Sequence, residues 1–130
     1  CEVLARSGIS EPASVDVALP ARFTSGRLGL SQLLEKGDFD VIVCSSDTLA
    51  QGAIIEAQSR GLQVPKALAV IGFGDLDFAA GNQPAITTVS VDRQIIGKRA
   101  ATMLADRIEG SAVDDTIVDI GFHFVERESA

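Results

Sequence analysis

The stretch FDVIVCSSDTLAQGAIIEAQSRGLQVP, residues 39–65, contains a short strand, a polar turn and a helix, in that order. Residues 41–44 are apolar and rich in β-branched side chains, which predicts a strand buried on both faces. Asp47 then stands at the N-cap position, and apolar residues recur at helical spacing over residues 48–60 until Gly61 ends the helix. Because polar residues gather directly after a strand, this unit predicts a small-molecule site at the carboxyl edge of an open parallel sheet.

The rest of the chain continues the alternation of strands and helices. Further strands are predicted at residues 15–19, 69–73, 87–91 and 117–125, and further helices at residues 25–35 and from an Asp92 N-cap to about Gly110. Residues 1–8 have the pattern of the last turns of another helix. This order predicts an α/β fold with a mostly parallel, Rossmann-like sheet flanked by helices.

Length and composition restrict the kind of protein. The 130 residues can form one core but not two full domains, and the chain opens without methionine in what resembles the end of a helix, so we expect a fragment of a longer protein. The net charge of −7 provides no basic surface for nucleic acid. Two cysteines predict no disulfide framework, and no apolar run approaches the ~20 residues that span a membrane. A cytoplasmic location is expected.

The chain contains parts of several enzyme motifs but completes none of them. Gly72 and Gly74 begin a dinucleotide-binding pattern, but Asp77 stands where its third glycine is required. His123 is the sole histidine, which leaves neither a catalytic triad nor a histidine-rich metal site with enough candidates. A phosphoacceptor role for Asp47 lacks the acidic pair at an earlier strand end. The sequence therefore predicts no enzyme, no catalytic residue, no bound metal and no cofactor.

Several blocks, in order and at matching spacing, strongly resemble the lactose-repressor (LacI/GalR) family of bacterial transcription regulators. They are CSSDTLAQGAI at 44–54, the G-L-x-V-P pattern at 61–65, AVIGFGD at 69–75 and the P-x-I-T-T-V pattern at 84–89, followed by a helix with Gly97, Ala100 and Ala101. Within the family, IGFGDLDFA and the later DIGF are similar to the gluconate-repressor branch. The resemblance covers nearly the whole chain.

The resemblance implies the C-terminal half of a type I periplasmic-binding-protein-like effector domain. Residues 1–88 and 114–130 would form the C-terminal subdomain, and residues 89–113 would belong with a missing N-terminal subdomain. The intact protein would be a homodimer that binds operator DNA through a missing N-terminal helix-turn-helix and responds to a sugar or sugar acid such as gluconate. The apolar stripe of the 92–110 helix should then be exposed, swapped or buried in a neighbouring copy, because such patches seldom stay bare. It comprises Ile95, Ile96, Ala100, Met103, Leu104 and Ile108.

Five residues are effector-site candidates by this resemblance. Phe23 stands where the family packs a bulky side chain on its effector, and Ser46 stands where the family often has Asn, with Ser45 as its neighbour. Gly74 stands where the family commonly has Asp. The absence of that carboxylate favours an anionic effector, because the carboxylate would have repelled it. Asp75 remains as a loop bracket or ligand, and Arg22 is the nearest cation for an anion. These residues could also have a purely structural role. Phe23 could cover the sheet edge, and Asp75 and the two serines could stabilise their turns.

One alternative stays open at this point. A periplasmic sugar-binding protein of a transport system shares the two-lobed fold and could share these pocket residues. The sequence upstream of residue 1 would distinguish the two, because a secretion signal would favour transport and a helix-turn-helix would favour a regulator.

Overall fold

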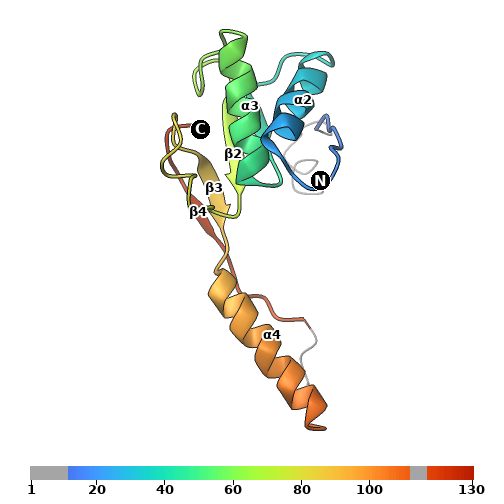
Figure 1. The fold of residues 1–130 in the computed structure, drawn as a ribbon. Helices are drawn as coiled ribbons and strands as arrows, with labels where there is room; N and C mark the ends of the chain where they lie inside the picture. The colour runs from blue at the N-terminus through green and yellow to red at the C-terminus, as the bar shows by residue number, and fades with distance from the viewer. Residues whose placement is uncertain (1–11, 112–116) are drawn as a thin grey trace.

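A computed structural model of the chain describes residues 12–111 and 117–130 (Figure 1). The predicted helix end at residues 1–8 lies outside the described residues. The elements follow in the order α2 (Phe23–Leu34), β1 (Val41–Val43), α3 (Asp47–Ser59), β2 (Ala69–Phe73), β3 (Thr87–Ser90), α4 (Arg93–Ile108) and β4 (His123–Val125).

The sheet has the strand order β1-β2-β3-β4. Strands β1, β2 and β3 run parallel, with Ile42 opposite Val70 and Ile71 opposite Thr87, whereas β4 pairs antiparallel with β3. The prediction of a mostly parallel sheet within an α/β fold is therefore confirmed. Since the first three strands are parallel, their carboxyl ends lie along one edge of the sheet.

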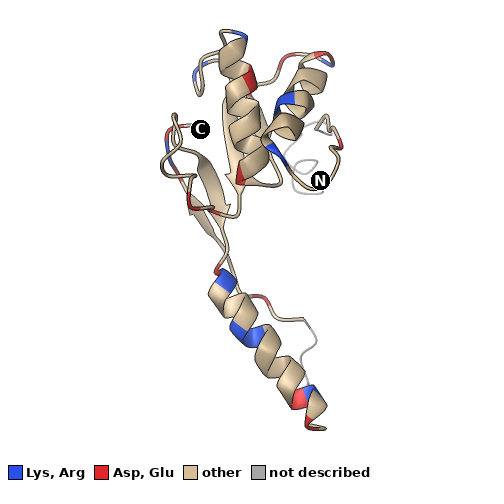
Figure 2. Cartoon of the chain, in the orientation of Figure 1, with Lys and Arg blue, Asp and Glu red and all other residues tan. Residues whose placement is uncertain are grey.

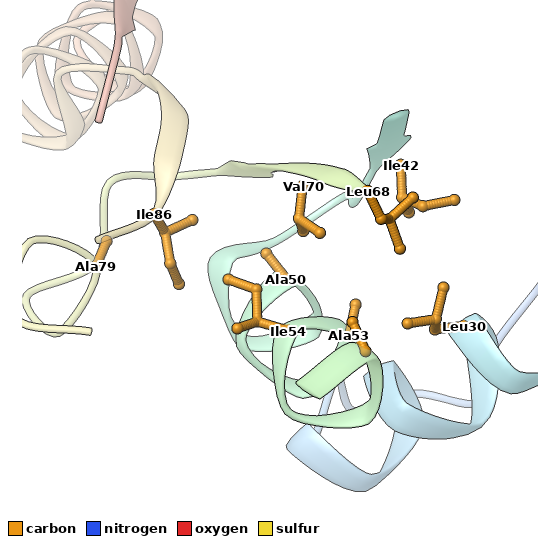
Figure 3. Packing of buried hydrophobic residues seen from close by; sticks show 10 residues of the cluster. Leu30, Ile42, Ala50, Ala53, Ile54, Leu68, Val70, Ala79 and Ile86 are labelled. Carbon is orange, nitrogen blue, oxygen red and sulfur yellow. The ribbon is translucent and has the colours of Figure 1, made fainter. Parts of the chain in front are cut away.

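The core lies between the sheet and helices α2 and α3 (Figure 3). Strand side chains such as Ile42 and Val70 point toward Ala50 and Ile54 of α3, and Leu30 of α2 closes one side of the cluster. Helix α3 and strand β2 follow their predicted bounds closely, because their apolar residues match a helical repeat and a buried strand respectively. These elements position the carboxyl edge of the sheet.

One strand prediction is wrong and two are wrong in part. Residues 15–19 form no strand, and Val17 instead packs against α2, where a Cβ on Gly29 would meet its Cγ1 at 3.2 Å. Strand β1 is therefore an edge strand with one face uncovered among the described residues, so that Ile42 is 7% exposed but Val43 is 72% exposed. In the predicted strand 117–125 only His123–Val125 pairs, because its partner β3 ends at Ser90.

Helix α4 extends away from the rest of the described structure (Figure 1). Asp92 caps it as predicted, because the Asp92 carboxylate accepts hydrogen bonds from the backbone amides of Gln94 and Ile95. None of its residues is buried, and Leu104 on the apolar stripe is 61% exposed. Of the three outcomes expected for this stripe, the single chain presents the exposed one. No helix in the described ranges is long and apolar enough to cross a membrane.

The last residues of the chain are built into the sheet. Ser129 is fully buried, and its hydroxyl donates to the Val70 carbonyl at 2.6 Å while accepting from the Thr87 amide. The Val70 amide donates to the Ser129 carbonyl at 2.7 Å. The tail is thereby fixed between β2 and β3, which places Arg127 beside the loop that follows β2.

Candidate functional site

The predicted site residues gather at the carboxyl edge of the sheet. Ser45 and Ser46 follow β1, and Asp75 follows β2. Helix α2 begins at the same edge, because its first turns pack on the first turns of α3: a Cβ on Gly52 would meet the Phe23 carbonyl oxygen. Charged residues of both signs lie at this end of α2 and α3 and where α4 begins (Figure 2).

Phe23 forms an aromatic pair that the sequence analysis did not anticipate. Its ring meets that of Phe78 edge to face, with ring centroids 6.2 Å apart. Phe78 lies in the loop between β2 and β3 and is partly buried against the core, whereas Phe23 is 48% exposed. The pair therefore offers an open aromatic surface, of the kind that packs on the C–H face of a sugar.

Ser46, and not Asp47, is the N-cap of α3. The Ser46 hydroxyl accepts a hydrogen bond from the Leu49 amide at 3.3 Å, and its backbone is extended. The prediction that Asp47 caps the helix is wrong, because Asp47 is already the first helical residue. Ser46 still lies at the predicted edge, next to the exposed Ser45.

Asp47 instead ties three elements together beneath the site. Its carboxylate is fully buried, and accepts hydrogen bonds from the Thr88 hydroxyl at 2.6 Å and from the Leu76 amide at 2.7 Å. A Cβ on Gly72 would collide with this carboxylate, which explains why β2 carries glycine there. Asp47 thus fixes the loop after β2 against α3 and β3, and its oxygens face protein donors.

Asp75 is held in a strained backbone conformation and in an ion pair. Its φ of 50° lies in the left-handed region, directly after Gly74 with φ 114°. The Arg127 guanidinium donates to its carboxylate at 2.7 Å and, through its other terminal nitrogen, to the Ile86 carbonyl at 2.9 Å. The hydrogen bond from Arg127 holds the pKa of the Asp75 carboxyl below its usual value, against an opposing effect of burial.

Arg22 lies at the N-cap of α2 and is exposed, without a side-chain cap for that helix. Arg93 begins α4 and donates to the Asp75 carbonyl at 3.4 Å. Both cations therefore lie near the edge, as an anionic effector would require. Arg27, by contrast, forms an ion pair with Glu56 of α3 at 2.9 Å and is half exposed, so it is a surface charge.

Cys44 provides no reactive group at this edge. Burial, and then the negative charge of Asp47, raise the pKa of the Cys44 thiol to about 12. The thiolate is therefore scarce at neutral pH, and Cys44 behaves as a small apolar residue. In the described part of the chain, no group of three histidine, cysteine, aspartate or glutamate side chains is placed to hold a metal ion.

A cavity of about 460 Å³ adjoins the edge without containing the whole candidate site. It lies between α2, β1 and the chain that precedes α2, and is lined mainly by apolar residues. Ser45 and Ser46 reach it, whereas Phe23 and Asp75 lie outside its lining. The described chain thus presents an open edge and not a closed pocket around the five candidates.

The sequence analysis missed Arg127 and Phe78, which contact the candidates Asp75 and Phe23, and Thr88, which binds Asp47 beneath the site. Each meets a partner far along the chain: Arg127 is 52 residues from Asp75, and Thr88 is 41 residues from Asp47. No local spacing signals such pairs. The one available signal was composition, because Arg127 follows the last strand in an otherwise acidic Glu-Arg-Glu stretch.

Comparison with known proteins identifies the architecture. The family of periplasmic binding protein-like domains matches residues 5–130. The HTH-type transcriptional regulator GntR of Pseudomonas aeruginosa is 38% identical over 104 residues, which cover 80% of this chain and 30% of that protein. The chain therefore spans about a third of the length of the curated relatives it matches.

Solved structures agree with this relationship. The transcription regulator GntR from Chromobacterium violaceum superposes with a TM-score of 0.75 at 38% identity, covering 85% of this chain and 41% of that one. The transcriptional regulator CelR, solved in complex with cellobiose, superposes with a TM-score of 0.89 at 26% identity, covering 99% and 40% respectively. In both, about half or more of the neighbour's chain has no counterpart here.

Proposed function

The chain belongs to the periplasmic-binding-protein-like domain family, in the form found in LacI-family transcriptional regulators, and from this we propose that it is the C-terminal half of the effector-binding domain of a ligand-responsive repressor. Residues 1–88 and 114–130 would form one subdomain. Residues 89–113, with α4, would cross to an N-terminal subdomain outside this chain. The bare apolar stripe of α4 supports this division, because a helix of this kind needs a partner.

The observation that carries the proposal is the convergence of the carboxyl ends of β1 and β2 with the start of α2. It brings the half-exposed Phe23 with its aromatic partner Phe78, two serines and the Asp75 loop to one edge, which is where open α/β sheets bind small molecules. The effector would lie between this edge and the missing subdomain. Its site on this side would include Phe23, Ser45, Ser46, the Asp75 loop and Arg22.

The proposed effector is a sugar or a sugar acid such as gluconate. A neutral sugar is favoured by CelR, which is a structural neighbour solved with cellobiose. A sugar acid is favoured by the resemblance of IGFGDLDFA to the gluconate-repressor branch, and by a charge balance in which Asp47 and Asp75 already have donors while Arg22 is exposed. We favour the sugar acid on the second ground.

The intact protein would act as a cytoplasmic homodimer on operator DNA. Effector binding between the subdomains would change their angle and with it the spacing of the DNA-binding heads. The effector can shift operator affinity only by its differential affinity for the two arrangements, and the coupling is reciprocal. The names of the relatives favour this role over an enzyme or a transport protein.

Calorimetric titration of the full-length protein tests the proposal. Gluconate, 6-phosphogluconate, 2-ketogluconate, ribose and galactose would be titrated with and without operator DNA. A sugar acid that binds and changes operator affinity is the expected result. Binding of a neutral sugar alone would replace the effector class, and turnover, or binding uncoupled from DNA, would contradict the regulator.

Substitutions on α2 and after β1 test the site. Phe23→Ala should weaken effector binding about tenfold by removing the stacking surface, since aromatic contacts contribute about 1 kcal/mol beyond their area. Leu28→Ala is the matched control, because Leu28 lies on the same helix and is likewise exposed. Ser45→Ala is cleaner than Ser46→Ala, which also removes the α3 cap. Unchanged effector affinity in Phe23→Ala and Ser45→Ala would contradict the site.

A further inference from the structure

The ion pair between Asp75 and Arg127 joins the candidate site to the last residues of the chain. The two atoms lie 2.7 Å apart, with the Arg127 side chain 18% and the Asp75 side chain 29% exposed. Both groups are therefore partly shielded from water, so their mutual attraction is stronger than that of a surface pair.

The geometry holds each partner in place independently of the pair. The Arg127 amide donates to the Thr87 hydroxyl, and one of its terminal nitrogens donates to the Ile86 carbonyl. Hydrogen bonds fix the backbone on both sides of Asp75. The Gly74 amide donates to the Val89 carbonyl, and the Leu76 amide donates to the Asp47 carboxylate. The backbone at Asp75 and the Arg127 guanidinium are therefore both held by contacts outside the ion pair.

The other carboxylates near this edge are accounted for differently. Asp47 is fully buried on two donors, and Asp92 accepts from two amides of α4. Asp77 is exposed in the loop, where water screens its charge. Asp75 is thus the partly shielded carboxylate at this edge whose charge is balanced by a cation in direct contact.

We infer that Arg127 is a specificity-determining residue of the effector site, because it neutralises Asp75 and so allows this edge of the sheet to accept an anionic effector. The inference rests on the proposed function. Without the Arg127 guanidinium, the Asp75 carboxylate would lose its one direct cationic partner among the described residues and keep only the weaker influence of Arg93, which donates to its backbone carbonyl. The less compensated carboxylate would repel a sugar acid, while a neutral sugar would feel no such repulsion. The lowered pKa of Asp75 agrees with strong pairing to Arg127.

A double-mutant cycle on the full-length protein tests this inference by titration with gluconate. Arg127→Gln should weaken gluconate binding on the order of fivefold to tenfold, because water at this open edge screens most of the repulsion between the Asp75 carboxylate and the anion. Asp75→Asn should strengthen it, because Arg127 would then be an unpaired cation. The double variant should return to near the wild-type affinity, because neither charge remains.

Controls separate charge from damage to the fold. Arg60→Gln makes the same change of charge and removes an ion pair of similar length, 2.8 Å from Glu56, at the opposite end of α3, and should leave gluconate binding unchanged. A double variant as weak as Arg127→Gln would mean that Arg127 only supports the structure, which overturns the inference. Weaker binding by Asp75→Asn would mean that Asp75 itself contacts the effector, which also overturns it.

The wild-type titration distinguishes this inference from the function on which it rests. If the wild-type protein binds none of the sugar acids, the proposed effector class fails and the inference fails with it. If the wild-type protein binds gluconate but the cycle does not show the three expected shifts, the inference alone fails.

Discussion

Helices α3 and α4 begin in the same way and end in opposite surroundings. Each has a side-chain N-cap, Ser46 for α3 and Asp92 for α4, and each carries apolar residues at helical spacing. Yet α3 buries seven residues against the sheet and α2, whereas α4 buries none. Local signals thus specify a helix, but burial depends on partners elsewhere in the protein. The contrast supports the proposal that α4 packs against a subdomain outside this chain.

Truncation of one apolar side chain in each helix should show the largest difference between them. Ile54→Ala in α3 should lower the free energy of unfolding by about 3 kcal/mol, because Ile54 is fully buried in the core. Leu104→Ala in α4 should change it by less than about 0.5 kcal/mol, because Leu104 is mostly exposed. Urea unfolding of the 130-residue chain measures both, and equal losses would remove the contrast.

Glycine substitutions should give effects of opposite sign in the two helices. Gly52→Ala should destabilise the chain by about 2 kcal/mol, since its Cβ would collide with the Phe23 carbonyl where α2 crosses α3. Gly97→Ala should stabilise it by about 0.5 kcal/mol, because nothing lies within 4 Å of the added methyl and alanine favours a helix. The same urea series measures both. Destabilisation by Gly97→Ala would indicate that α4 is packed after all.

The smallest expected effect concerns acid stability of the lobe that contains α3. The pKa of Asp75 is lower in the folded chain than its ordinary 3.8, so its contribution to stability is complete above about pH 4 and is lost as the pH falls through the folded value. Asp75→Asn should therefore make stability fall less steeply below pH 4, and Arg127→Gln should do the same by removing the partner. Thermal melts between pH 2.5 and 6 measure this slope. A wild-type slope in both variants would contradict the pairing.

Local pattern predicted the elements of this fold well where caps and apolar spacing agree. Strand β2 and helix α3 follow such patterns, as does α4 with its Asp92 cap. The prediction failed for residues 15–19, whose alternation is that of a strand but whose Val17 packs on α2. Pairing of an edge segment depends on contacts that alternation does not encode.

The candidate site was predicted less completely than the fold. The sequence placed Ser46 and Asp75 at one edge of the sheet, because strand ends of a parallel sheet coincide, whereas Phe23 was proposed only from the family resemblance. It could not predict the hydrogen bonds between Asp47 and Thr88 or between Asp75 and Arg127, because these contacts join residues more than 40 positions apart. It also assigned the α3 cap to Asp47 and not to Ser46, since both residue types cap helices well.

Hydrogen exchange of α4 in the 130-residue chain and in the full-length protein tests the central claim most directly. At a concentration low enough to keep the short chain monomeric, amides of α4 should exchange rapidly while those of α3 stay protected. In the full-length protein, α4 should gain protection of at least about a hundredfold, because its apolar stripe would be covered by the N-terminal subdomain. Strong and equal protection of α4 in both proteins would contradict the account.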